Sequence, residues 1–390
     1  MRICYILLSP TFGMHQYTAD LANRVVRDAP GVAVHLVTTS NYPADRYVPE
    51  VQVHTPLTSH NTGLALSSLR LGRLRAVWQC IREIEPDLVH FTGPHLWNVA
   101  LLHRLRQAGI PTIHTLHDLD PHQGARGGGL LHAWNGLVLR LADSILVHGR
   151  TYAQRLYRAR AKVVYTPLLH LFVSHELDQT LGQQAAAVNP GEPFILFFGR
   201  LEKYKGVNDL LTAYAQLRGV FTANGQPEAV IPRLVLAGPG RLHDLWVGSL
   251  PPGVEVRNRL VGDAEAVDLF RRCSLVALPY VDGTQSALIP AAYYFGKPVV
   301  VTRVGALAEY VEEARTGLVV EPGHPASLTR ALYAALSDPD RLAQMGLAGR
   351  AWYEQQREQE TRQLWQLYRW SSADRQRSAA RGEWQIARGK

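Results

Sequence analysis

Two cations flank a short turn in the stretch GRLEKYKG, residues 199–206. Arg200 directly follows the apolar run FILFF, and Lys205 precedes Gly206, where a helix is predicted to begin. The turn between a parallel strand and the N-terminus of a helix suits phosphate, because free N–H groups point out of it. Arginine adds a bidentate donor and lysine a point charge. The turn suits a phosphate site, although the spacing alone slightly favours two solvated loop residues.

A second set of polar side chains lies in HTLHDLDPH, residues 114–122. Side chains alternate along a strand, so His114 and His117 are predicted to point to opposite faces. That arrangement argues against a shared metal ion, and the spacing is poor for zinc. His117 falls at the end of the strand TIHTL, where it could hydrogen-bond a ligand. Asp118 follows it and either orients a ligand or caps the next turn.

These residues need elements that bring them to one edge of a sheet, and the chain alternates strands with helices twice over. Each half carries five or six short apolar runs separated by helical stretches. The runs are RICYILL, VAVHLVTT, DLVHF, TIHTL, SILVH and KVVYT, then FILFF, RLVLAG, LVALP, PVVVT and GLVVEP. This alternation predicts parallel sheets covered by helices. We therefore predict an α/β protein with two Rossmann-like domains that face a deep cleft.

The domain boundaries follow from where the alternation stops and restarts. Residues 1–168 form the predicted first domain, 169–192 a linker without strong periodicity, and 193–354 the second domain. A helix over about 355–375 is expected to return to the first domain, and 376–390 reads as a basic tail. A chain of 390 residues is too long for one ordinary core, which agrees with two domains.

Composition excludes several classes of protein. With 46% hydrophobic and 19% charged residues, the chain is typical of globular proteins. No apolar run approaches the roughly 20 residues of a membrane span, and the N-terminus is a poor signal peptide. The scattered Cys4, Cys80 and Cys273 suggest neither a disulfide framework nor a metal site, so a cytoplasmic location is expected.

The net charge of +8 is concentrated in residues 1–170, which hold 17 Lys and Arg against 10 Asp and Glu. This excess suggests a phosphate, nucleic-acid or acidic membrane partner, and solvated helix faces explain it equally well. The segment LRLGRLRAVW could lie peripherally on a bilayer, although a solvated helix is preferred. No nucleic-acid-binding motif is present, so no nucleic-acid partner is expected.

Several motifs together resemble the family 4 glycosyltransferases, which are retaining enzymes with the GT-B fold. GRLEKYKG resembles their G-R-L-x-x-x-K-G motif, and SPTFGMHQYTADLANRV resembles their first loop and helix. PDLVHFTGPH and TIHTLHD resemble the next site-forming strands. LVLAGPG, FRRCSLVALPY and GKPVVVTRVGALAEYVEEARTGLVVEPG resemble the second domain. The likeness covers almost the whole chain.

The resemblance implies a role for each matching residue. Arg200 and Lys205 would bind the diphosphate of a nucleotide-sugar, and His117 and Asp118 would lie near the donor sugar; these four are the predicted catalytic residues. The predicted donor-binding residues also include Gly13, Gly199, Gly238, Val261, Thr284, Gln285 and Ser286. The predicted acceptor-binding residues are His15, Tyr17, His95 and His122, and a glycine-rich loop with hinges at 127–129 is expected to close over the acceptor. No metal or other cofactor is expected, since the nucleotide-sugar, with UDP or GDP, is a substrate.

One departure from the family pattern concerns two glutamates that lie eight residues apart ahead of G-x-P-V-V. The corresponding positions here are Gly283 and Ala291, and Asp282 would substitute only if the loop shifts by one residue. The amides of residues 284–286 could still hold a phosphate, and Gln285 could hydrogen-bond a sugar hydroxyl. The departure leaves ribose recognition and the choice of sugar open.

The implied activity is transfer of a sugar to a glycan, lipid-linked or small-molecule acceptor, with retention, as in polysaccharide biosynthesis. Double displacement needs a second carboxylate, and none is well placed. Front-face substitution is therefore preferred, with Arg200, Lys205 and helix dipoles stabilising the leaving group. Two alternatives remain: a nucleotide-sugar 2-epimerase and a non-catalytic nucleotide-sugar-binding module. The sequence does not name the sugar, the base, the acceptor or the linkage.

Overall fold

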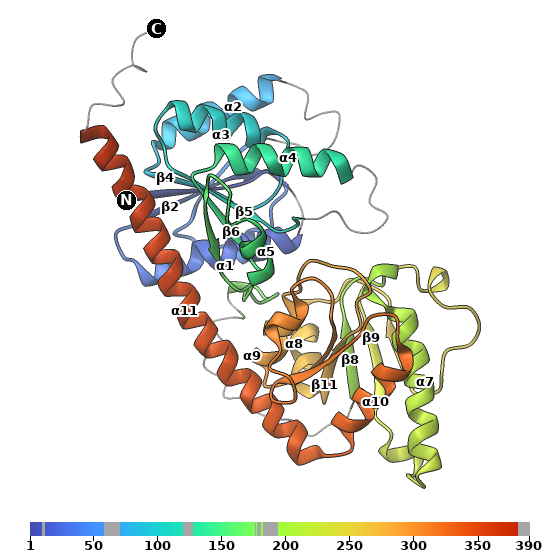
Figure 1. Cartoon of the computed structure of the whole chain (residues 1–390). Helices are drawn as coiled ribbons and strands as arrows, with labels where there is room; N and C mark the ends of the chain where they lie inside the picture. Colours follow the sequence, from blue (N-terminus) through green and yellow to red (C-terminus); the bar gives the residue numbers. More distant parts are fainter. Residues whose placement is uncertain are drawn as a thin grey trace. The chain divides into compact units, whose positions relative to one another are not determined.

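The computed structural model describes residues 1–9, 12–57, 71–119, 128–175, 177, 181 and 194–380 (Figure 1). It forms two compact units. The first comprises the described residues up to 177 together with 358–380, and the second comprises those from 181 to 357. Most of the predicted linker 169–192 and the tail beyond 380 lie outside the described residues. So do two predicted site positions, His122 and Gly127.

The first unit is built on a sheet of seven parallel strands in the order β3-β2-β1-β4-β5-β6-β7. Its central strands are buried on both faces, as expected for a parallel sheet between helices. The strands are β1 (Arg2–Leu7), β2 (Ala33–Thr39), β3 (Gln52–Leu57), β4 (Leu88–Phe91), β5 (Thr112–Leu116), β6 (Ser144–Val147) and β7 (Lys162–Tyr165). The helices between them are α1 (Phe12–Asp28), α2 (Leu71–Ile84), α3 (Trp97–Gln107), α4 (Gly128–Leu141) and α5 (Arg150–Arg155).

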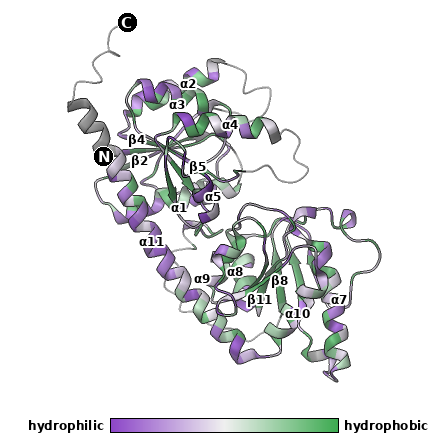
Figure 2. Ribbon diagram, in the orientation of Figure 1, coloured by the Kyte–Doolittle hydropathy of each residue, from purple (hydrophilic) through white to green (hydrophobic). Residues whose placement is uncertain are grey.

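The second unit has a separate sheet of six parallel strands in the order β10-β9-β8-β11-β12-β13. Two parallel sheets flanked by helices confirm the predicted α/β class. The strands are β8 (Phe194–Phe198), β9 (Arg233–Ala237), β10 (Val254–Arg257), β11 (Leu275–Leu278), β12 (Val299–Thr302) and β13 (Gly317–Val320). The helices between them are α7 (Val207–Ala223), α8 (Asp263–Arg272) and α9 (Leu288–Tyr294), and α10 (Pro325–Leu336) follows the last strand. Figure 2 shows strands such as β8 and β11 in green, which marks the apolar centre of the unit.

Three features differ from the sequence predictions. The edge strands β3 and β10 were not predicted, because QVHTPL contains a proline and VEVR carries two charges. Gly128 and Gly129 are not loop hinges, since they form the first turn of α4. The apolar spacing of the following residues and the packing of α4 on α3 extend the helix into this glycine-rich stretch.

The C-terminal helix α11 (Pro339–Ala380) has 42 residues, and the predicted span of about 355–375 was too short at both ends. Proline is favoured at the first helical position. The following sequence is rich in Ala, Leu, Gln, Glu and Arg, which are all strong helix formers. Its residues from Glu358 onward belong to the first unit.

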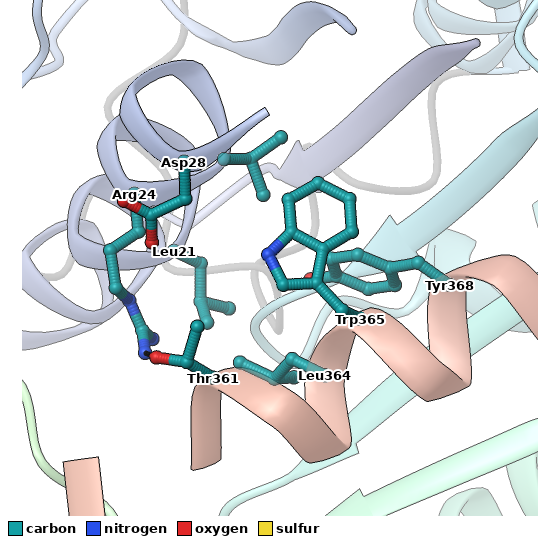
Figure 3. Close-up of a pocket in the computed structure, with 8 residues that line it drawn as sticks. Leu21, Arg24, Asp28, Thr361, Leu364, Trp365 and Tyr368 are labelled. Carbon is teal, nitrogen blue, oxygen red and sulfur yellow. Dashed lines mark hydrogen bonds between the residues drawn. The ribbon is translucent and has the colours of Figure 1, made fainter. Parts of the chain in front are cut away.

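A buried ion pair fastens α11 to α1 within the first unit. Nη1 of Arg24 lies 2.9 Å from Glu360, and the two side chains are only 7% and 2% exposed. Asp20 lies 3.1 Å from the same guanidinium. Figure 3 shows the small pocket beside this contact, where Trp365 and Tyr368 of α11 lie near Leu21 of α1. Burying charges is costly unless they are paired, so each partner depends on the other.

Glu360→Ala is expected to destabilise the protein by about 2–4 kcal/mol, because the buried Arg24 guanidinium would lose the buried carboxylate that it contacts through two nitrogens. The urea dependence of the α-helical circular dichroism measures the loss. The matched control is Glu358→Ala, which removes an exposed ion pair with Arg362 on the same helix. That variant should lose no more than about 0.5 kcal/mol. Equal losses in the two variants would contradict the assignment of Glu360 as an anchor.

Candidate functional site

Each sheet has one point at which its strand order reverses, and there the loops after two adjacent strands diverge. In the first sheet this point lies between β1 and β4, and in the second it lies between β8 and β11. Open parallel sheets bind ligands at such points, outside the carboxyl ends of the strands. Arg200 and Lys205 follow β8, whereas Gly13 follows β1 and His95 follows β4.

The two predicted phosphate ligands of the second unit have different surroundings. Arg200 is 64% exposed, and its guanidinium lies 2.7 Å from the half-exposed carboxylate of Glu202. Lys205 lies in a short 3-10 turn, Lys203–Lys205. Its Nζ is 2.6 Å from the Tyr280 hydroxyl and 4.1 Å from the centre of that ring. Among the described residues, no carboxylate lies within 4 Å of Lys205 Nζ. This ammonium group therefore has only uncharged partners there.

Main-chain contacts lock the loops after β8 and β11 together. Gly206 has φ +67°, and a Cβ at this position would overlap the carbonyl oxygen of Pro279. The carbonyl of Tyr204 accepts the N–H groups of Val281 at 2.8 Å and Asp282 at 3.2 Å. A glycine is thus required where α7 begins, and the lysine turn is fixed to the loop after β11.

The loop after β11 carries the predicted Thr284, Gln285 and Ser286. The side chains of Thr284 and Ser286 are buried, and Gln285 is half-buried. The Ser286 hydroxyl lies 3.3 Å from that of Tyr280 and accepts the N–H of Leu288 at 3.3 Å. The structure places Ser286 and Lys205 on the same tyrosine. That connection was not foreseen from the sequence, because the residues involved are far apart in the chain.

The acidic residue of this loop is engaged locally. Oδ1 of Asp282 accepts the N–H of the adjacent Gly283 at 2.8 Å. Gly283 itself has φ +152°, and Ala291 is fully buried in α9. A contact between Asp282 and a nucleotide-sugar donor stays a prediction.

The remaining predicted donor residues lie in neighbouring loops of the second unit. The Gly199 N–H donates to the carbonyl of Ala237 at 2.9 Å, and a Cβ on Gly238 would overlap the Gly199 carbonyl. Asn258, which follows β10, accepts the N–H of Gly240 at 2.9 Å. The half-buried Val261 lies three residues further on. The loops after β8, β9 and β10 therefore adjoin at one edge of the sheet.

In the first unit, His117 is held directly after β5. Its Nε2 lies 2.9 Å from the carbonyl oxygen of Thr92, so Nε2–H donates and the lone pair is on Nδ1. The ring of Tyr17 stands edge-on to it, with the centroids 5.0 Å apart. Burial lowers the pKa of His117, whereas the Thr92 hydrogen bond and the charge of Asp118 act in the opposite direction. Burial therefore disfavours the charged imidazolium at this position.

His114 points to the other face of the sheet, as predicted. Its Nε2 lies 3.0 Å from the side-chain amide of Asn98, and its ring stacks on Phe91. No group of three or more His, Cys, Asp or Glu side chains among the described residues is arranged to hold a metal ion.

A buried chain of hydroxyl and imidazole groups runs from α11 to the neighbourhood of His117. The Tyr17 hydroxyl lies 3.1 Å from Thr115 Oγ1, which lies 2.9 Å from His90 Nε2. His90 Nδ1 lies 3.1 Å from the hydroxyl of Tyr368, which lies 3.1 Å from that of Tyr5. His90, at the centre of this chain of contacts, is fully buried. In the sequence, this series of hydrogen-bonded groups was indicated only by the polar residues within apolar strands.

Three of the four predicted acceptor residues are described, and all three are buried: His15, Tyr17 and His95. The Tyr47 hydroxyl lies 2.7 Å from Nδ1 of His15, and the N–H of Trp97 donates to Nδ1 of His95 at 3.1 Å. Gly13 is exposed in the first turn of α1. The contacts of these residues with an acceptor or a donor stay predictions, as do those of the other candidate site residues.

Two sequence models of protein families match this chain. The family described as Glycosyl transferase 4-like domain matches residues 12–168, and the one described as Glycosyl transferases group 1 matches residues 192–338. The D-inositol 3-phosphate glycosyltransferase of Gordonia bronchialis is 28% identical over 384 residues, which cover 88% of this chain and 80% of the relative. The enzyme of that name from Kribbella flavida is 29% identical over 375 residues, which cover 86% and 85%.

Solved structures with the same fold cover nearly the whole chain. The sucrose-phosphate synthase from Thermosynechococcus elongatus superposes with a TM-score of 0.74 at 20% identity, over 96% of this chain and 100% of that one. Anabaena Alr3699/HepE in complex with UDP-glucose gives a TM-score of 0.65 at 20% identity, over 94% and 99%. These comparisons do not support the epimerase alternative, because the matching families and the relatives are glycosyltransferases.

Acidification is expected to destabilise the first unit through its buried histidines. Burial lowers the pKa of His15 and His95 to about 4 and that of His90 and His114 to about 3. Below pH 6.5 the unfolded chain binds protons that the folded chain does not, so stability falls as the pH falls toward 4. Each such group contributes up to about 1.4 kcal/mol per pH unit.

Thermal unfolding midpoints between pH 7.5 and 5 measure this effect. His114→Gln removes one buried group and should flatten the pH dependence, whereas His243→Gln, at a position exposed to solvent, should keep the wild-type dependence. A pH profile that is identical in all three proteins would contradict the assignment.

Proposed function

We propose a specific reaction for this chain on the premise that it belongs to the family 4 glycosyltransferases with the GT-B fold. The reaction is transfer of a sugar from a nucleoside-diphosphate sugar to an acceptor hydroxyl, with retention of the anomeric configuration. One observation carries the proposal: Arg200 and Lys205 lie at the reversal point of the second sheet, directly before a helix of 17 residues.

The charges at this edge suit a diphosphate. The partner of Arg200 is Glu202, and an ion pair between exposed side chains is worth at most about 1 kcal/mol. A diphosphate competes readily with such a partner, since it accepts bidentate hydrogen bonds from a guanidinium. Among the described residues, the hydrogen-bond partner of Lys205 Nζ is the uncharged Tyr280 hydroxyl, and the ammonium has three N–H donors. The two cations would thus neutralise the leaving group.

The donor is proposed to carry UDP, with GDP as the alternative. The Anabaena structure that shares this fold contains UDP-glucose, which supports a uridine donor. The relatives named D-inositol 3-phosphate glycosyltransferase support a small-molecule acceptor, whereas glycan and lipid-linked acceptors remain open. A thermal-shift screen with nucleotide-sugars identifies the donor, because a ligand of the native state raises its stability. A panel without any stabilising nucleotide-sugar would contradict the proposal.

Retention by front-face substitution is the proposed course of the reaction. The bond from the anomeric carbon to the diphosphate oxygen breaks, and the acceptor oxygen bonds to the same face. The acceptor proton passes to the leaving phosphate oxygen. His117 would hydrogen-bond a donor-sugar hydroxyl, and Asp118 would orient the acceptor. NMR of the first product tests this course, since an inverted anomeric centre would exclude it.

Arg200→Ala and Lys205→Ala are each expected to weaken binding of UDP by about 10- to 150-fold, since a hydrogen bond to a charged group contributes about 1.5–3 kcal/mol. Turnover should fall as well, with little change in the unfolding midpoint. Calorimetric titration with UDP measures the affinity. The control is Arg303→Ala, which removes a similarly exposed ion pair with Glu321 in the same unit. Unchanged affinity in the double variant of Arg200 and Lys205 would refute the phosphate assignment.

His117→Ala should reduce turnover far more than donor affinity, because the proposed contact strengthens as charge develops on the sugar. His114→Ala should act through folding stability instead, since its ring packs on the opposite face of the sheet. Turnover, donor affinity and unfolding midpoint are measured for both variants. A folded His117 variant with full activity would remove this residue from the site.

A non-catalytic nucleotide-sugar-binding module is the second candidate, because Gly283 and Ala291 replace the two glutamates of the family pattern. Incubation with the donor distinguishes the two. A transferase slowly releases free nucleotide even without acceptor, whereas a binding module leaves the donor intact.

A cytoplasmic location with peripheral membrane association also belongs to the proposal. No described helix is long and apolar enough to cross a membrane. On α4, Leu130 is 62% and Leu137 is 43% exposed, and Arg140 lies exposed three residues further on. An apolar stripe next to a cation suits the surface of an anionic bilayer. Flotation with vesicles that contain phosphatidylglycerol tests this, and loss of binding in Leu130→Ser/Leu137→Ser would support α4 as the contact.

A further inference from the structure

We infer that Tyr280 is a positioning residue for Lys205 and that it turns the hydroxyl proton of Ser286 toward the bound diphosphate. This inference rests on the proposed function, because it assumes that Lys205 binds the diphosphate. It assigns Tyr280 a role that its position in the sequence did not suggest, since 75 residues separate it from Lys205.

Tyr280 is held rigidly at the reversal point of the second sheet. It follows β11, is 1% exposed, and its carbonyl oxygen accepts the hydroxyl of Thr302 from β12. Its ring lies under Lys205 Nζ at 4.1 Å, and its hydroxyl oxygen accepts an N–H of the same ammonium at 2.6 Å. The lysine is thus fixed by a hydrogen bond and by a cation–π contact to one side chain.

The positions of the protons follow from the contacts of the two hydroxyl groups. Lys205 is a donor only, so the Tyr280 oxygen accepts and its own proton must go elsewhere. The partner within reach of that proton is Ser286 Oγ, at 3.3 Å. In a buried site a donor that lacks an acceptor is costly, so Tyr280 O–H donates to Ser286.

Ser286 Oγ then accepts twice, from the Tyr280 hydroxyl and from the N–H of Leu288. Both lone pairs of this oxygen are used, and its own proton is available as a donor. Because the Lys205 ammonium donates one N–H to Tyr280, its other two N–H groups remain for a ligand. The pair therefore presents a cation and a neutral donor, both fixed by Tyr280, to one anionic ligand.

Tyr280 contributes to ligand binding because it holds the Lys205 side chain in place, and it adds no charge of its own. A free lysine side chain loses rotamer entropy when a ligand fixes it. Tyr280 fixes the ammonium before the ligand arrives, so less entropy is lost on binding. The loop contacts of Tyr204 with Val281 and Asp282 keep the lysine turn and the tyrosine in register.

The test compares Tyr280→Phe, which keeps the ring under the ammonium, with Tyr293→Phe in the same unit. Tyr293 is fully buried, and its hydroxyl contacts Thr316 at 2.7 Å, so it is a matched control for loss of a buried hydroxyl. Calorimetric titrations use UDP, with uridine as a ligand that lacks phosphate. We expect Tyr280→Phe to weaken UDP binding about 5- to 10-fold and uridine binding little. Tyr293→Phe should change neither affinity.

A double-mutant cycle separates positioning from a general structural role. If Tyr280 acts through Lys205, Tyr280→Phe should have no more than about a twofold effect on UDP affinity in a Lys205→Ala background. Equal effects in both backgrounds would overturn the inference. Ser286→Ala provides an independent test and should weaken UDP binding about 5-fold or more. Unchanged UDP affinity in Ser286→Ala would overturn the role of Ser286. This test still applies if Tyr280→Phe fails to fold.

The cycle also distinguishes this inference from the proposed function. If Lys205→Ala alone leaves UDP affinity unchanged, the phosphate assignment of the proposed function fails. If Lys205→Ala weakens binding but Tyr280→Phe does not, only the positioning role of Tyr280 fails.

Discussion

Contact between main-chain atoms at the reversal point of the second sheet is the constraint on which the candidate donor site depends. Gly206 lies against the carbonyl of Pro279, and Gly238 lies against that of Gly199, each at a distance that excludes a Cβ. The loops after β8, β9 and β11 are therefore in direct contact through their backbones. Because the backbone is fixed, the few side chains that project from it can be placed accurately, which is what electrostatic stabilisation of a leaving group requires.

The first unit positions its polar residues by a different means. Its sheet contains a buried chain of hydroxyl and imidazole groups that begins at Tyr368 of α11 and ends at Tyr17, next to the His117 ring. Buried polar groups are costly unless every member is paired, so such a chain is ordered only when α11 is docked. The Arg24–Glu360 ion pair keeps it docked. The surroundings of His117 thus depend on a helix that joins the sheet from the far end of the sequence.

The sequence predicted those strands and turns that a local pattern of residues determines. Runs such as FILFF and TIHTL have the composition of buried strands, and the turn at Arg200 has the signature of a helix start, so both were found. The edge strand β10 alternates valine with charged residues, and its pairing depends on β9, so it was missed. The contact between Lys205 and Tyr280 was missed for a related reason, since only the neighbouring positions of β8 and β11 in the folded sheet bring the two together.

The backbone and burial at Gly283 and Ala291 bear on the two glutamates of the family pattern that this chain lacks. At Gly283 φ is +152°, a region that residues with a Cβ rarely adopt, so a glutamate there would require a different loop. Ala291 is fully buried in α9, and a carboxylate in its place would need a partner to offset desolvation. The change at these positions is therefore part of the loop conformation and not a simple loss of two side chains. Lys205 from the loop after β8 and Ser286 from the loop after β11 both contact Tyr280, and Asp282 is hydrogen-bonded to the adjacent main chain. If the proposed donor site is right, its recognition would rely on the phosphate charge that every nucleoside-diphosphate sugar carries more than on carboxylate bonds to ribose or sugar hydroxyls.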